Sequence, residues 1–152
     1  MPLPNIFNKE VTDVLIRRID HLTESTKPKW GKMNASQLLA HCNVTYEMVY
    51  EDIHPKPNVL MQIILKMLVK KRVVDESPYP HNLKTAPQFI IKGDKDFLKE
   101  KNRLIVYLNK TRELGEAYFD GKVSHSFGKL DKTEWNNMFY KHLDHHLTQF
   151  GV

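Results

Sequence analysis

Apolar side chains recur along the chain at intervals of three and four residues, which is the spacing of one face of an α-helix. The first such stretch covers residues 7–22 and ends in a polar run. The second opens at Asn34, with Gln37 three positions later, and extends to about Glu51. Asn followed by Gln at this spacing is the capping-box pattern of a helix N-terminus. The pattern predicts two helices in this part of the chain.

Three more helices follow from the same reasoning. Asn58 precedes a strongly apolar stretch that extends to about Val74, and another helical pattern covers residues 94–115, ending at a glycine. The last stretch starts at Asp131, which forms a second capping box with Glu134, and it continues nearly to the carboxyl end. We therefore expect five helical segments.

The segments between these helices are irregular. Three prolines mark residues 75–88 as a long connection, which we expect to lie over the helices. Residues 116–130 form a second, glycine-containing loop, and alternating strand patterns are almost absent. These features predict an all-α fold, an antiparallel four-helix bundle with an additional short helix or a long proline-rich connection. We expect one domain covering residues 1–152.

Composition narrows the class of protein. The chain has 152 residues, of which 41% are apolar, which suits one domain with its own core and excludes a disordered or fibrous protein. A single cysteine, Cys42, excludes an internal disulfide and a zinc cage of thiolates. No leader sequence is recognisable, so we expect a cytoplasmic protein. The longest apolar stretch, residues 59–69, is shorter than the roughly twenty residues of a membrane span.

The formal net charge of +5 comes from one part of the chain. Residues 54–92 contain seven basic and two acidic residues, and the remaining charges cancel. This distribution is not typical of a nucleic-acid surface, so neither nucleic acid nor membrane is expected as a partner. The favoured interpretation places Lys66 and Lys70 on the solvated face of a helix whose other face is apolar. The alternative is that the cluster from Lys66 to Arg72 contacts phosphates or anionic lipid.

Three histidines are the candidate metal ligands. His142 and His146 lie four residues apart in the last predicted helix, so their side chains share one face and can reach the same ion. That face also carries Trp135 and Phe139, and His41 falls on the apolar stripe of the second helix. All three imidazoles are therefore expected to point inward. Three neutral imidazoles can hold a divalent transition metal and leave positions open for water or substrate.

A metal-free interpretation stays open, because histidines four residues apart also occur as ordinary hydrogen-bonded pairs. No glutamate lies between His142 and His146, so the zinc-protease motif is absent. Asp144 and His145 turn away from the ligand face, and Cys42 is expected to be a small buried residue without a catalytic role. The histidines expected at the surface are His21, His54 and His81.

The pocket around such a site is less well defined. Trp30, Tyr46 and His125 are candidate pocket residues, and His125 lies in a loop before the last helix, where it can line the pocket mouth. Glu47, Tyr46 and His125 are the candidates for a general base, and the sequence does not rank them.

Three segments, Trp30–His41, His125–Leu130 and Tyr140–Gly151, resemble the DinB-like (DinB/YfiT) metal-binding superfamily, and the chain is most similar to an uncharacterised branch of it. The specific part of the resemblance is one histidine early in the second helix and an H-x-x-x-H pair on the last helix before a glutamine. The resemblance implies a four-helix bundle that is frequently a homodimer. It also implies that His41, His142 and His146 hold zinc or nickel.

Members of this superfamily with known activity are metal-dependent transferases or isomerases that use low-molecular-weight thiols, and others are hydrolases. The favoured hypothesis is therefore a metal-dependent S-transferase or hydrolase in which the three histidines activate water or a low-molecular-weight thiol on a small electrophilic substrate. The alternative is a non-catalytic, stress-related binding module with a structural metal or a metal-free histidine cluster. Any reactive thiol would arrive with the substrate, because Cys42 is expected to be buried.

Overall fold

The computed structural model describes all 152 residues, from Met1 to Val152. It contains six α-helices, one short 3-10 helix and one two-stranded sheet, which confirms the predicted all-α class. In chain order the elements are α1 (Lys9–Asp20), α2 (Ala35–Tyr50), α3 (Val59–Leu68), α4 (Lys70–Val74), η1 (Pro87–Phe89), α5 (Phe97–Phe119), β1 (Val123–Ser124), β2 (Gly128–Lys129) and α6 (Lys132–Gln149).

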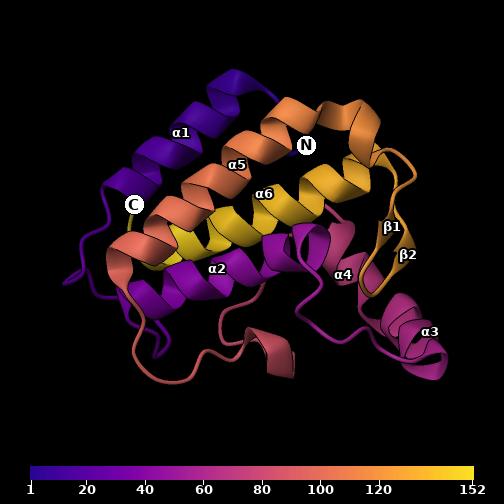
Figure 1. Cartoon of the computed structure of the whole chain (residues 1–152), viewed down its shortest axis with the longest axis horizontal. Helices are drawn as coiled ribbons and strands as arrows, with labels where there is room; N and C mark the ends of the chain where they lie inside the picture. The colour runs from indigo at the N-terminus through magenta and orange to yellow at the C-terminus, as the bar shows by residue number, and fades with distance from the viewer.

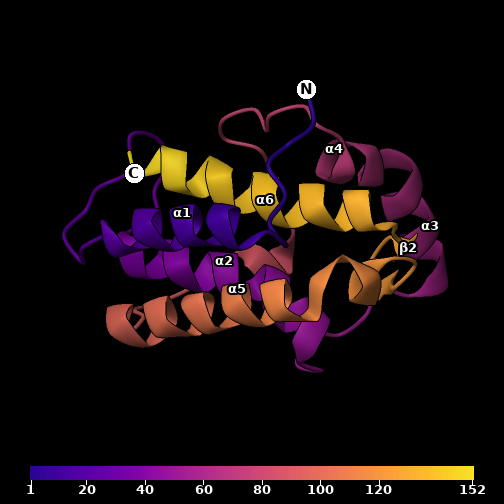
Figure 2. The same cartoon turned by 90° about the horizontal axis from the view of Figure 1, so that it is seen from above.

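The helices α1, α2, α5 and α6 share one hydrophobic core (Figure 1). Figure 2 shows α6 along one side and α5 along the other, with α1 and α2 between them. In the core, the ring of Phe139 lies 5.4 Å from that of Phe119 and 5.4 Å from that of Trp135, measured between ring centroids. Burying side chains of this size contributes about 2–3 kcal/mol each, so this contact anchors α6 against α5. None of the helices combines the length and the apolar composition that crossing a bilayer requires.

Both predicted capping boxes are present. The Asn34 side chain accepts a hydrogen bond from the backbone N–H of Gln37, and the Gln37 side chain accepts one from the Asn34 N–H. Asp131 and Glu134 make the same reciprocal pair at the start of α6. Each cap stabilises its helix by about 1 kcal/mol and sets the residue at which the helix begins. Because the caps fix where α2 and α6 begin, they also fix how far along each helix the histidines lie.

The apolar stretch 58–74 does not form the single helix that its pattern predicts. It divides at Val69 into α3 and α4. Helix α4 is held on α6, because Lys141 of α6 donates to the carbonyls of Arg72 and Asp75, at 2.9 and 2.6 Å. Helix α3 turns away from this anchor and contributes no residue to the core.

The segment 116–130 also differs from the expected loop. Gly115, with φ 71° and ψ 174°, ends the regular part of α5 as predicted, and one more helical turn follows to Phe119. Residues 123–129 then form the small antiparallel hairpin β1–β2. Strands of two residues are too short for an alternating pattern to be recognised in a sequence.

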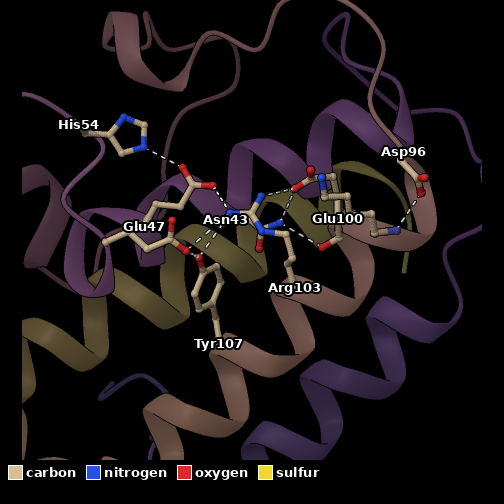
Figure 3. Close-up of polar contacts among 9 residues, drawn as sticks. Asn43, Glu47, His54, Asp96, Glu100, Arg103 and Tyr107 are labelled. Atoms are coloured by element: carbon tan, nitrogen blue, oxygen red, sulfur yellow. Dashed lines mark hydrogen bonds and ion pairs between the residues drawn. The ribbon is translucent and has the colours of Figure 1, made fainter.

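A largely buried charge network joins α2 to α5 (Figure 3). Arg103 of α5 donates to Glu47 at 2.5 Å and to Glu100 at 2.8 Å. Asn43 donates to Glu100 at 2.8 Å, and the ring of His54 lies 2.7 Å from Glu47. The side chain of His54 is only 16% exposed, so the expectation that it lies at the surface is wrong. The loop after α2 folds back and places it against Glu47.

Candidate metal centre

Three histidines from two helices converge below the proline-rich connection. His41 lies in α2, and His142 and His146 lie on one face of α6. One ring nitrogen of each lies within 4.8 Å of the other two. His41 and His146 are buried, and His142 is half-buried. The cluster contains the three residues that the sequence singles out, and it can hold a metal ion.

Outer hydrogen bonds orient two of these rings. Nδ1 of His41 lies 2.8 Å from the carbonyl oxygen of Phe89, which follows the proline-rich segment. Nδ1 of His146 lies 2.8 Å from Oε1 of Gln149, one turn later in α6. Both partners are acceptors, so each Nδ1 carries the proton and donates. Each Nε2 is therefore left with a free lone pair, which is the tautomer that a metal ligand needs.

The third ring has two possible tautomers. Nδ1 of His142 lies 3.2 Å from the hydroxyl of Thr45, which can donate or accept. Nε2 of His142 lies 3.1 Å from Nε2 of His41. If Thr45 donates, His142 can donate from Nε2 to His41 and complete a metal-free hydrogen bond. If Thr45 accepts, all three Nε2 lone pairs face one another, and a cation or a hydrogen-bond donor among them is needed to relieve their repulsion.

The spacing fits a first-row transition metal. Two imidazole nitrogens bound tetrahedrally at about 2.0–2.1 Å lie about 3.3 Å apart, close to the 3.1 Å between His41 and His142. Two such bonds span at most about 4.2 Å, so the 4.8 Å limit of the cluster requires a small ring rotation to close around one ion. Three nitrogen donors suit zinc, nickel, copper or iron and do not suit magnesium or calcium.

The environment keeps the cluster neutral. Burial, with a smaller contribution from the neighbouring His41, lowers the pKa of His146 to about 3. Burial is also the main cause that lowers the pKa of His142 well below its ordinary value, with His146 and His41 adding to the effect. The pKa of His41 is lowered by burial as well, although the Phe89 carbonyl opposes this. Neutral imidazoles at pH 7 are ready to bind a metal without first losing protons.

Gln149 connects the cluster to the loop before α2. Its Nε2 donates to the carbonyl of Trp30 at 2.7 Å, which leaves Oε1 turned toward His146. Gly31 has a φ of +84°, and a Cβ built there would lie 2.5 Å from Nε2 of Gln149. Glycine is therefore required at this position both for the backbone conformation and for the close approach of Gln149. The loop thereby fixes the orientation of the His146 ring.

A cavity of about 170 Å³ lies near the cluster, and none of the three histidines lines it. Its lining includes His145, whose ring centroid is 5.0 Å from that of His146. The predicted pocket residue Trp30 also lines it and stacks on His81, with 3.8 Å between ring centroids. His81 is exposed as expected, but this stack gives it a partner that the sequence did not predict. Tyr79 lines the same cavity, so the proline-rich connection covers this face as predicted.

The other candidate residues lie elsewhere. Tyr46 is 2% exposed, and its ring stacks on Phe139 in the core. Burial raises the pKa of Tyr46 well above its ordinary value, so it stays protonated. The ring of His125 lies 3.3 Å from the carbonyl of His54 and is not part of the metal-ligand group. Cys42 is 2% exposed, and burial raises the pKa of its thiol, which agrees with a packing role.

The sequence assigned no role at the site to three residues that complete it. Gln149 lies three residues after His146, so the i, i+3 spacing was a local signal that could have found it. Thr45 shares the inward stripe of α2 with His41, but nothing local pairs it with His142. The Phe89 carbonyl is 48 residues from its partner, and backbone acceptors carry no sequence signal.

Together these features define a predominantly helical protein with a buried cluster of three histidines that can hold a metal. The family described as "Protein of unknown function (DUF1569)" matches residues 8–151, and the chain belongs to this family. The match includes His41, His142 and His146. No curated protein and no solved structure matches the chain.

Proposed function

We propose that this protein is a metal-dependent enzyme in which His41, His142 and His146 hold one divalent transition metal, zinc or nickel. The observation that carries the proposal is the orientation of the rings. His41 and His146 donate from Nδ1 to outer acceptors, so their Nε2 lone pairs converge with the His142 ring. Outer-shell acceptors of this kind typically fix the tautomer and orientation of metal-binding histidines.

The reaction class follows from the donor set. Three neutral ligands leave the ion's charge uncompensated and its coordination incomplete, as in catalytic sites. A divalent transition metal supplies Lewis acidity there, which makes water or a low-molecular-weight thiol a better nucleophile near neutral pH. The chain offers no thiol of its own, because Cys42 is sealed in the core. A thiol nucleophile would therefore arrive as a co-substrate.

The substrate we propose is a small electrophile. The cavity of about 170 Å³ beside His145 is too small for a macromolecule, and its mainly polar lining combines the flat rings of Trp30, Tyr79 and His81 with the charged groups of Lys141 and Asp144. The resemblance to the DinB-like superfamily belongs to this proposal, and so does the assignment of α1, α2, α5 and α6 to its antiparallel four-helix bundle. The activity is then an S-transferase or hydrolase reaction.

Elemental analysis of the purified protein tests the metal. We expect a near-stoichiometric divalent transition metal, lost in His142→Ala and retained in His145→Ala, which removes a neighbouring imidazole outside the cluster. Equal metal content in His142→Ala and the unmodified chain would contradict the proposal. Thiol transfer and hydrolysis are then assayed over a panel of small electrophiles, with metal-stripped protein as the control.

A second function is favoured by the Thr45 contact. The chain from Thr45 through His142 to His41 and Phe89 can close as hydrogen bonds without a metal. This arrangement suits a non-catalytic binding module in which the cluster, with or without a metal, is structural. A protein that carries no metal as purified and turns over no substrate of the panel supports this alternative.

A further inference from the structure

Helix α3 presents its apolar side chains to solvent. It lies at one end of the molecule, next to α4 and the hairpin β1–β2, in both views (Figures 1 and 2). None of its residues is buried, and seven of its ten side chains are large, apolar and 40–75% exposed. These seven are Val59, Leu60, Met61, Ile63, Ile64, Met67 and Leu68.

The exposed side chains form a continuous face. At about 100° per residue they cover roughly 200° of the helix circumference, with Leu60 and Met67 near the centre of the arc. Gln62 and Leu65 lie on the opposite side and are half-buried, and Gln62 donates to the carbonyl of Pro57. The polarity of α3 is therefore inverted relative to that of an ordinary surface helix, which turns its apolar face inward. An apolar face of this extent on a folded chain indicates an interaction surface.

The charges around α3 identify the partner. Residues 53–74 contain five basic residues and no acidic residue. Lys66, Lys71 and Arg72 are exposed, whereas Lys70 is paired with Glu134 at 2.7 Å. Lys66 lies at the edge of the apolar arc, where its amine can stay in water while its stem follows the apolar surface. An apolar helical face bordered by lysine and arginine is the pattern of a helix that lies in the surface of an anionic bilayer.

A second copy of the chain fits this face less well. In a two-fold symmetric contact the same surface patch is used on both copies, so the basic segment 53–74 of one copy would face that of the other, with no acidic residue of the segment to pair with its five basic ones. We propose that α3 docks this protein on anionic lipid surfaces, with the arc around Leu60 and Met67 inserted into the interface. The favoured sequence interpretation, in which only the lysine face is solvated, is wrong because the apolar face is exposed too.

The position of α3 suits this role. Helix α4, which directly follows α3, is held on α6 through Lys141. The C-terminal end of α3 is therefore attached to a fixed part of the fold. His142 and His146 lie in the second half of α6, toward the end of the helix that is farther from α3 (Figure 1). Docking through α3 therefore leaves the histidine cluster and its cavity accessible, and it does not depend on the proposed function.

Co-sedimentation of the full chain with vesicles tests the proposal. We expect binding to vesicles of phosphatidylcholine mixed with phosphatidylglycerol, weak binding to phosphatidylcholine alone, and a decrease with salt. The double substitution Leu60→Ser with Met67→Ser should lower the partition coefficient at least about tenfold. Leu98→Ser is the matched control, because Leu98 is 67% exposed and Leu60 68%, and it should bind like the unmodified chain.

A second pair of variants tests the charges. Lys71→Ala with Arg72→Ala should reduce binding to the mixed vesicles by roughly tenfold. Lys32→Ala with Lys95→Ala removes the same charge from exposed positions outside the segment and should have little effect.

Three outcomes overturn the proposal. The first is no binding of the unmodified chain to the mixed vesicles. The second is unchanged binding of the Leu60, Met67 variant, which would mean that the adsorption is purely electrostatic. The third is a dimer in light scattering that this variant converts to monomer, which would show that a second copy covers α3.

Discussion

Two buried polar clusters share helix α2, and they are built in opposite ways. In the network of Figure 3 the guanidinium of Arg103 sits between Glu47 and Glu100 and donates to both. In the histidine cluster the donors of His41 and His146 point outward, and the acceptor nitrogens face one another. The carboxylates of the first cluster are neutralised by an arginine of the chain itself. The second is completed only by a proton or a cation between the rings.

The comparison separates a structural polar cluster from a candidate binding site. Burying charged or polar groups is unfavourable unless each finds a partner, so an arrangement of converging lone pairs persists only if something offsets it. In the network that partner is Arg103, an internal residue. At the histidines it is either the Nε2–H of His142, present when Thr45 donates to Nδ1 of that ring, or a metal ion. Both possibilities can be distinguished by experiment.

The largest effect is expected from opening the closed cluster. Arg103→Met leaves Glu47 and Glu100, each with a side chain 9% exposed, without their cation. We expect a loss of about 3–5 kcal/mol in the free energy of unfolding, measured by chemical denaturation. The metal content of the protein that still folds should not change, because the two clusters are separate.

The matched control is Arg112→Met, which removes an arginine from the same helix. Arg112 pairs with Glu113, whose side chain is 70% exposed, so the change should stay within about 0.5 kcal/mol. Equal destabilisation by the two substitutions would mean that the buried network does not hold α2 to α5.

A smaller effect is expected from loosening one ring of the open cluster. Gln149→Leu removes the acceptor for Nδ1 of His146, so the ring loses its fixed tautomer and orientation. Metal affinity should fall about 10–100-fold in a competition titration with a chromophoric chelator. Thr148→Val changes the neighbouring, exposed residue of the same helix and should leave the affinity unchanged. If both variants bind metal equally well, Gln149 does not position a ligand.

The third effect is a pH dependence of the metal-free protein. Burial lowers the folded-state pKa of the three histidines, for His146 to about 3, whereas in the unfolded chain they titrate near 6.5. Below about pH 6.5 the unfolded chain takes up protons that the folded cluster does not. The stability that the neutral cluster contributes is therefore fully present above that pH and falls as the pH drops, and for His146 the fall continues toward pH 3 at up to about 1.4 kcal/mol per pH unit.

Denaturation of chelator-treated protein at several pH values measures this slope. His146→Leu should reduce it, while His21→Leu, which removes an exposed histidine of the loop after α1, should not. The same free energy of unfolding at pH 7 and pH 5 would show that the cluster is not kept neutral by burial.

Local signals account for what could be predicted. The two capping boxes, the end of regular α5 at Gly115 and the inward stripe that carries His41, His142 and His146 depend on neighbours within one or two turns. The docking of α4 on α6 could not be predicted, because it uses Lys141, which lies more than sixty residues after α4. Contacts over such distances leave no periodic pattern in a sequence.

The sequence by itself determined the helices, their caps and the three imidazoles that face inward, because helix formation and amphipathic burial are decided by residues a few positions apart. The tertiary structure decided how those imidazoles are used. Packing brought the Phe89 carbonyl, Thr45 and Gln149 to the outer nitrogens of the rings. It also left the apolar face of α3 without a partner. The tautomer of a histidine and the exposure of a helix face depend on contacts between residues far apart in the sequence, and these contacts form only in the folded chain.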